Sequence, residues 1–198
     1  MNIRSYKEID EFRREVLNSL NFMKGIALMK KIVGLFVMLL LLTGCAGNIK
    51  DGVAFMEEGK YEAAVEAFAK DVKKERNLDE AYRGLGIAYF ELEDYTAAVE
   101  AFEKAFKHET EKTAVLYSFL GASYLETEAY DKALDAYEQA LSCEDLTEEL
   151  KQEIQFNLIA VYENMANWDA AKKQMDKYIK KYPDDKRVEK EAEFLETR

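Results

Sequence analysis

The sequence contains little of what most enzymes and metalloproteins need. Its 198 residues include one histidine, His108, and two cysteines, Cys45 and Cys143, and no HExxH, GxSxG, P-loop or CxxC motif occurs. His108 lies in "FKHETEKT", at the end of an expected helix, where a solvated imidazole suits the helix dipole. We therefore predict a protein that is not an enzyme and that has no catalytic residues, no cofactor and no metal site.

Proline, strand-forming runs and positive charge are also scarce. The one proline is Pro183, and Ala, Glu, Lys, Leu and Tyr dominate where Val, Ile and Thr would form strands. This composition predicts an all-α protein. The formal net charge is −11, and an acidic surface is repelled by phosphate backbones, so the composition argues against a nucleic-acid partner.

Long hydrophobic runs are absent. The longest unbroken apolar stretch, "IVGLFVMLLLL" over residues 32–42, has 11 residues, whereas a transmembrane helix needs about 20. Lys30 and Lys31 precede this stretch and "LTGC" (residues 42–45) follows it. A basic flank, a short apolar region and small residues before a cleavage point predict a signal peptide rather than a membrane-spanning helix.

This segment resembles bacterial lipoprotein signal peptides, whose lipobox consists of an aliphatic residue, a small residue, Gly or Ala, and Cys. The resemblance implies that the thiol of Cys45 carries a diacylglyceryl group and that cleavage follows Gly44. Two acyl chains give the stable anchoring that one chain does not. We expect a palmitate-type lipid anchor on the extracytoplasmic face of the cell membrane or outer membrane. Ala46 lacks the Asp of the inner-membrane retention signal, which leaves an outer membrane or a single membrane open.

The predicted signal peptide does not begin at Met1, and a later methionine, Met29, offers an alternative translation start. Met29 opens "MKKIVGLFVMLLLLTGC", whereas residues 1–28 contain four acidic groups. We interpret 1–28 as a translated upstream extension and 29–44 as the signal peptide. Lys24-Gly25 can be encoded as AAAGGA, a ribosome-binding sequence. The alternative is that 1–28 is a genuine amphipathic helix.

The rest of the chain repeats itself. Residues 51–71, 85–105, 120–140 and 158–178 align without gaps, and their glycines Gly52, Gly86 and Gly121 are 34 and 35 residues apart. Ile159 follows after 38 residues, which places extra residues near 143–148. A period of this length is typical of stacked helical hairpins, whose apolar faces are buried only against neighbouring repeats.

The pattern resembles the tetratricopeptide repeat (TPR) family. Four sets of equivalent positions carry the resemblance: aromatic residues in the first helix (Phe55, Tyr89, Tyr124, Tyr162), aromatic residues opening the second helix (Tyr61, Tyr95, Tyr130, Trp168), alanines (Ala64, Ala98, Ala133, Ala171) and large residues (Phe68, Phe102, Tyr137, Met175). Asp71 and Tyr178 depart from the later alanine that Ala105 and Ala140 supply.

The resemblance implies a right-handed α-solenoid of about four TPR helix hairpins plus a C-terminal capping helix. We place the TPR domain at 45–182, with repeats at about 45–78, 79–112, 114–147 and 152–185, and the capping helix at 183–198. Asp184 and Asp185 are expected to start this last helix, which turns Val188, Ala192 and Leu195 inward. Cys143 has no partner in the chain if Cys45 is lipidated, so either a passive thiol or an intermolecular disulfide is open.

The resemblance also implies a partner-binding groove lined by the first helix of each repeat. Its predicted residues are Val53, Met56, Arg83, Ile87, Phe90, Ala122, Leu125, Phe156 and Ala160. The asparagine of the family's carboxylate clamp is absent from these positions. An apolar centre with an acidic rim (Glu57, Glu91, Glu126) predicts a bound peptide or amphipathic helix, preferably with basic residues.

Together these patterns predict a membrane-anchored TPR lipoprotein that acts as a protein–protein interaction scaffold or assembly adaptor at the bacterial cell envelope. Its partners are expected to be other proteins or peptides, chiefly envelope proteins, with membrane contact through the lipid on Cys45. Two alternatives are left open: an accessory subunit of a cell-envelope enzyme, and a self-associating structural protein that forms homo-oligomers.

Overall fold

A computed structural model describes residues 48–108 and 111–197 of the protein. The chain divides into two units, Met1–Thr43 and Gly44–Arg198, and all described residues belong to the second unit. The predicted extension (1–28), the predicted signal peptide (29–44) and Cys45 lie outside the described residues. These three assignments stay predictions.

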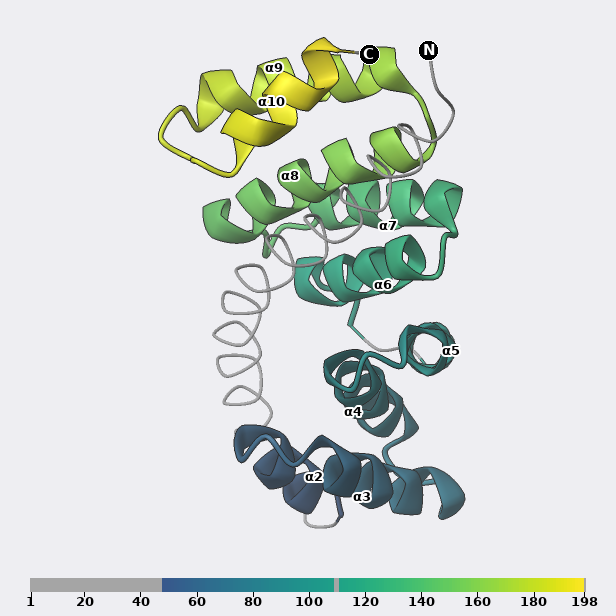
Figure 1. The fold of residues 1–198 in the computed structure, drawn as a ribbon. Helices are drawn as coiled ribbons and strands as arrows, with labels where there is room; N and C mark the ends of the chain where they lie inside the picture. The colour runs from purple at the N-terminus through teal and green to yellow at the C-terminus, as the bar shows by residue number, and fades with distance from the viewer. Residues whose placement is uncertain (1–47, 109–110, 198) are drawn as a thin grey trace, which may run out of the picture. The chain divides into compact units, whose positions relative to one another are not determined.

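The described residues form helices joined by short turns, and no strand occurs within them. The helices are α2 (Asn48–Glu57), α3 (Tyr61–Lys73), α4 (Leu78–Glu91), α5 (Tyr95–Lys107), α6 (Ala114–Glu126), α7 (Tyr130–Ser142), α8 (Glu148–Asn164), α9 (Trp168–Lys181) and α10 (Val188–Glu196). The predicted all-α solenoid of four hairpins and a final capping helix is confirmed (Figure 1).

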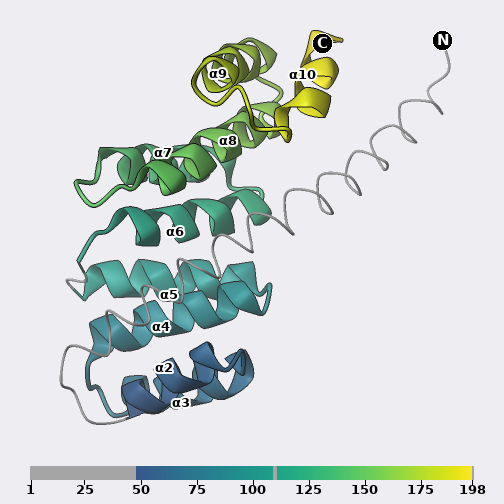
Figure 2. The same cartoon turned by 90° about the vertical axis from the view of Figure 1, so that its left-hand side faces the viewer.

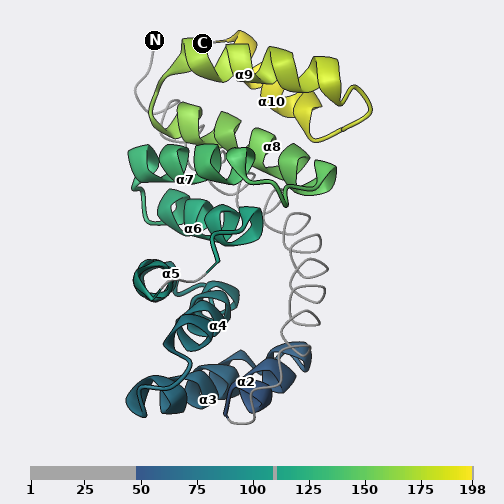
Figure 3. The same ribbon diagram turned by 180° about the vertical axis from the view of Figure 1, so that it is seen from behind.

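Successive helices pair into four hairpins, α2–α3, α4–α5, α6–α7 and α8–α9, and α10 packs on α9. Figures 1 and 2 show these hairpins stacked in chain order. Each first helix also packs against the next first helix, so that α2, α4, α6 and α8 form a continuous row. Among the described helices, no second helix packs against the next second helix to this extent. We call the side of the stack formed by these first helices the inner side. Figure 3 shows the same stack of helices from behind.

Sequence signals at the helix ends explain where the elements begin. Asp94, Thr113, Thr147 and Asn167 each accept a hydrogen bond from the backbone N–H three residues on, and so cap α5, α6, α8 and α9. The turn inside each hairpin contains a residue with positive φ at the same repeat position: Gly59, Glu93, Glu128 and Ala166. This shared left-handed residue reverses the chain within a few residues.

Rings from the second helices fit against glycines of the first helices. A Cβ added to Gly52 or Gly84 would lie 2.6 or 2.5 Å from the Phe68 ring, so this ring fills the space between two successive first helices. Phe102 lies in the same way against Gly86. Both rings are 1% exposed. Burying a side chain of this size contributes about 1.5–3 kcal/mol to folding.

Two boundaries differ from the sequence expectations. The longer spacing before Ile159 arises within α8, which has 17 residues against 13 in α6. Four residues make about one helical turn, so the extra residues extend the helix rather than the loop. The last helix begins at Val188, not at Asp184 or Asp185, because the Asp185 carboxylate accepts the backbone N–H of Arg187 in a turn instead of capping a helix.

Candidate functional site

The predicted groove residues all lie on the first helices, and the row α2–α4–α6–α8 brings them to one side of the stack. Their burial differs. Five are buried (Val53 2%, Met56 5%, Ile87 2%, Phe90 8% and Phe156 3% exposed), and four are half-buried (Arg83, Ala122, Leu125 and Ala160). The buried five offer a partner little surface. Partner binding by the nine residues stays a prediction, and the surface left for it is concentrated on α6 and α8.

Helix α6 carries the more open apolar face of the inner side. Val115, Ala122 and Leu125 are half-buried, and Glu126 is exposed beside them. At 100° per residue these positions fall within one sector of the helix, together with Ser118, which is 3% exposed. The opposite faces of α6 are covered, since Phe119 stacks with Phe102 at 6.1 Å between ring centroids.

Carboxylates gather at the edge of the inner side where the hairpin turns lie. Burial, and then Glu91 through its charge and a hydrogen bond, raise the pKa of Tyr61 to about 12. Burial and the charges of Glu126, Glu93 and Glu91 also raise the pKa of Tyr95. Loss of solvent and the negative charge of Glu93 raise the pKa of Glu126. Burial makes the largest contribution to each of these shifts, and the charge of a neighbouring carboxylate adds to each.

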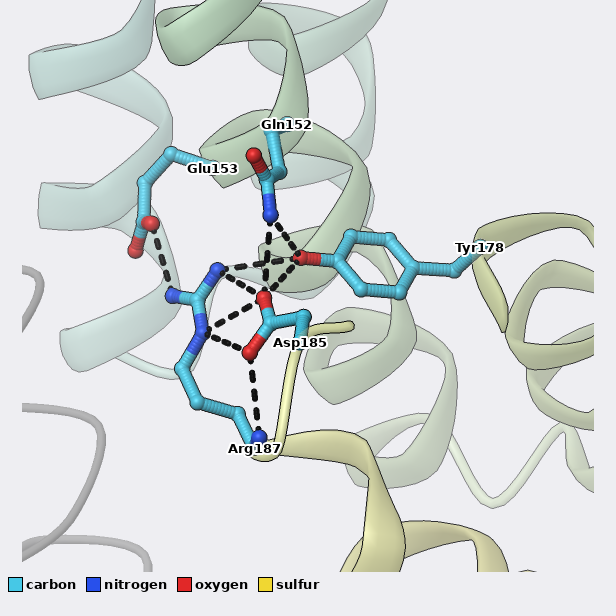
Figure 4. A network of polar contacts seen from close by, with 5 residues as sticks. All are labelled: Gln152, Glu153, Tyr178, Asp185 and Arg187. Carbon is cyan, nitrogen blue, oxygen red and sulfur yellow. Dashed lines mark hydrogen bonds and ion pairs between the residues drawn. The ribbon is translucent and has the colours of Figure 1, made fainter. Parts of the chain in front are cut away.

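A second polar cluster holds the C-terminal end of the stack together (Figure 4). The Asp185 carboxylate accepts hydrogen bonds from Arg187 Nη2 (2.7 Å), Arg187 Nε (2.9 Å), the Tyr178 hydroxyl (2.6 Å) and Gln152 Nε2 (3.0 Å). Arg187 Nη1 also donates to Glu153 Oε2 at 2.8 Å. The network links α8, α9 and the residue that precedes α10.

The electrostatics of this network are those of a structural anchor. Burial acts to raise the pKa of Asp185, but the hydrogen bonds from Arg187 and Tyr178 outweigh it and hold that pKa well below its usual range. Burial opposes the charge of Arg187, while the bonds to Asp185 and Glu153 raise its pKa above the ordinary value. Each charged group is matched by its neighbours, so the cluster holds helices together and offers no reactive group.

Sequence reasoning did not single out this network, although a signal for it was present. Tyr178 stands where the second and third repeats have Ala105 and Ala140, which are 1% and 0% exposed. Asp71 is the other departure from that alanine, and its carboxylate, 1% exposed, accepts from Arg76 Nη2 at 3.0 Å. Polar residues at an alanine position of a repeat thus marked sites where the stack uses hydrogen bonds.

The remaining candidate residues lie apart from both clusters. His108 is exposed at the end of α5 and its ring stacks on Tyr82 at 5.5 Å. Cys143 is a free, half-buried thiol that donates to the Gln139 carbonyl at 3.3 Å, and burial and Asp145 raise its pKa. Within residues 48–108 and 111–197 no group of His, Cys, Asp and Glu is arranged to hold a metal ion. No helix in these ranges is long and apolar enough to cross a membrane.

Similar solved structures have the same architecture. The chain is similar to the crystal structure of MamA protein, with 24% identity and a TM-score of 0.59 over 69% of this chain and 72% of that chain. A structure of MamA AMB-1 gives 18% identity and a TM-score of 0.59 over 71% and 74%. The crystal structure of the APC/C hetero-tetramer Cut9–Hcn1 has 20% sequence identity to the chain and a TM-score of 0.54, over 70% of this chain and 27% of that chain. Identities this low show the fold alone.

Sequence comparisons give the family. Tetratricopeptide repeat models match residues 50–109 and 84–146, and a further tetratricopeptide repeat model matches residues 153–185. A search of curated proteins found no match. Since the matched ranges include most of each of the four helix hairpins and cover more than half of the chain, the chain belongs to the tetratricopeptide repeat family.

Proposed function

We propose that this protein is a lipid-anchored TPR scaffold of the bacterial cell envelope that captures a peptide or helix of another envelope protein on its inner side. TPR domains are interaction scaffolds, and the Cut9–Hcn1 neighbour is itself an assembly of two different proteins. The observation that carries the proposal is the continuous row of first helices, on which partly exposed apolar side chains lie beside exposed carboxylates. Apolar surface on a strongly charged protein marks a partner site.

The binding half of the proposal is tested by crosslinking from single positions. A photocrosslinking residue at Leu125, on the inner side, is expected to capture the partner in intact cells, while the same residue at Leu134 of α7, also half-buried but on a second helix, captures none. Equal capture from both positions would refute the inner side as the binding surface. Ile87 and Phe90 are unsuitable because their burial means that a polar substitution would unfold the stack.

The anchoring half rests on the "KK…LTGC" leader and needs a separate test. Metabolic labelling with a palmitate analogue is expected to label the wild type and the Cys143→Ser variant, but not the Cys45→Ser variant. Mass spectrometry is expected to find Cys45 as the acylated first residue of the mature protein. An unprocessed, unacylated chain would refute the anchor and leave the binding half unaffected.

A further inference from the structure

The inner side also indicates the chemistry of the partner. We infer that the occupant is a cationic amphipathic helix, whose apolar face lies on the α6 face formed by Val115, Ala122 and Leu125 and whose basic residues face Glu93 and Glu126. This inference rests on the proposed function, because it specifies the partner of the same surface.

The shape of the α6 face fits a helix. Val115, Ala122 and Leu125 recur at intervals of seven and three residues, which places them on one face of the helix. At the position of Ala122, α4 has the larger Ile87, which is 2% exposed, and α8 has the short Ala160. Helix α8 packs against α6, and its half-buried Ala160 is the equivalent apolar position on that neighbouring first helix. An amphipathic helix with apolar residues at i, i+3, i+4 and i+7 buries such a strip.

The charge at the end of this strip selects the sign of the partner. Glu93 and Glu126 are both exposed, and in the described part of the chain neither forms an ion pair. They lie close enough together for the charge of Glu93 to raise the pKa of Glu126. Some other exposed carboxylates are paired, as Glu100 is with Lys104 at 3.7 Å and Glu148 with Lys181 at 3.0 Å. A cationic group placed here would relieve the repulsion, while an anionic one would add to it.

The main alternatives are an uncharged apolar segment and an anionic one. An uncharged apolar segment would bury the apolar side chains of the α6 face but leave the repulsion between Glu93 and Glu126 in place. An anionic helix would meet like charge on approach, which slows association and weakens binding. Only an amphipathic helix with basic residues at the end that meets Glu126 both covers the apolar α6 face and offsets the repulsion between Glu93 and Glu126.

The test uses three synthetic 14-residue peptides that share one amphipathic leucine pattern and differ in the polar residue, which is Lys, Gln or Glu. Each carries a fluorophore, and its affinity for the purified full chain is measured by anisotropy. We expect the Lys peptide to bind at least about tenfold more tightly than the Gln and Glu peptides. Its affinity should fall as salt rises from about 0.05 to 0.5 M, because exposed charges are screened.

Four variants locate the binding. Leu125→Asp and Glu126→Lys change the strip and its acidic end, and Leu134→Asp and Glu138→Lys make the same changes on α7, where Leu134 is half-buried and Glu138 exposed. We expect the α6 variants each to weaken the Lys peptide about tenfold or more and the α7 variants to change it less than about twofold. Circular dichroism checks the fold of each variant, and Glu126→Gln, which removes one charge and changes little else, is expected to give an intermediate loss.

The outcomes separate this inference from the proposed function. If Leu125→Asp weakens all three peptides alike and Glu126→Lys changes none, helix binding on the inner side stands and the cationic partner is refuted. If the α7 variants weaken binding as much as the α6 variants do, or none of the four has an effect, the inner side is not the binding surface and both are refuted. Absence of binding by every peptide refutes the cationic amphipathic helix alone.

Discussion

The two ends of the solenoid are held by different interactions, although they follow the same repeat plan. Between the first two hairpins, the Phe68 ring is enclosed by Gly52 and Gly84, and the contact is apolar. Between the last hairpin and α10, Asp185 and Arg187 form a network of charged hydrogen bonds with α8 and α9. The difference shows that packing of a ring against glycines joins a hairpin to the complete repeat that follows it. At the end of the stack, where no further repeat follows, polar contacts at one site hold the last helix.

The largest effect is expected from removing the ring. Phe68→Ala should lower the free energy of unfolding by about 3–5 kcal/mol, because it leaves a cavity between two successive first helices. Phe106→Ala is the matched control: Phe106 is half-buried and stacks on Tyr117 at 5.0 Å, so the same deletion should cost clearly less. Urea denaturation measures both. Equal losses would show that the glycine sites give no special stability.

A smaller and more local effect is expected from Arg187→Ala. Arg187 and Glu153 have side chains 17% and 9% exposed, and removal of one partner of a buried pair costs several kcal/mol. We expect a loss of about 2–4 kcal/mol confined to α10 and the end of α9, since solenoid repeats unfold in part independently. Hydrogen exchange measures it. Arg187→Lys, which keeps the charge but loses the forked geometry, should recover only part of the loss.

Acid should weaken the C-terminal anchor. The pKa of Asp185 is lowered in the folded protein, so its contribution to stability is complete above the unfolded value of about 4 and is lost as the pH falls further. Trp168 is the one tryptophan, and its ring lies 6.1 Å from that of Phe194 in α10. Its fluorescence should therefore report release of α10 below about pH 4. A change of equal size and midpoint in Asp185→Asn would contradict this account.

The smallest effect is expected on the outer surface. Glu100 and Lys104 form an exposed i,i+4 pair at 3.7 Å on α5. Glu100→Gln should lower the free energy of unfolding by no more than about 0.5 kcal/mol, because solvent and salt screen exposed pairs. Thermal denaturation at low and high salt measures it. A loss comparable to that of Arg187→Ala would mean that exposure does not separate the two kinds of ion pair.

Much of the fold could be predicted from the sequence because the same residue pattern recurs in four segments, and each segment supports the interpretation of the others. Glycines about 34 residues apart, each followed at a fixed distance by an alanine and a ring, predicted the stacked hairpins. Exposure was the weaker part of the prediction, since Ile87 and Phe90 were expected to line an open groove and are 2% and 8% exposed.

What the sequence by itself determined is the repeated hairpin and its apolar packing, because these depend on contacts between residues at fixed short separations that recur in each copy. Only the tertiary structure decided how the end is closed. The extra residues before Ile159 became a turn of α8, and Asp185 and Arg187 met Gln152 and Glu153 there, 33 and 34 residues away. These contacts occur at one place in the chain, so the internal repeats do not predict them. They depend on where the one-turn extension of α8 places the side chains of Gln152 and Glu153.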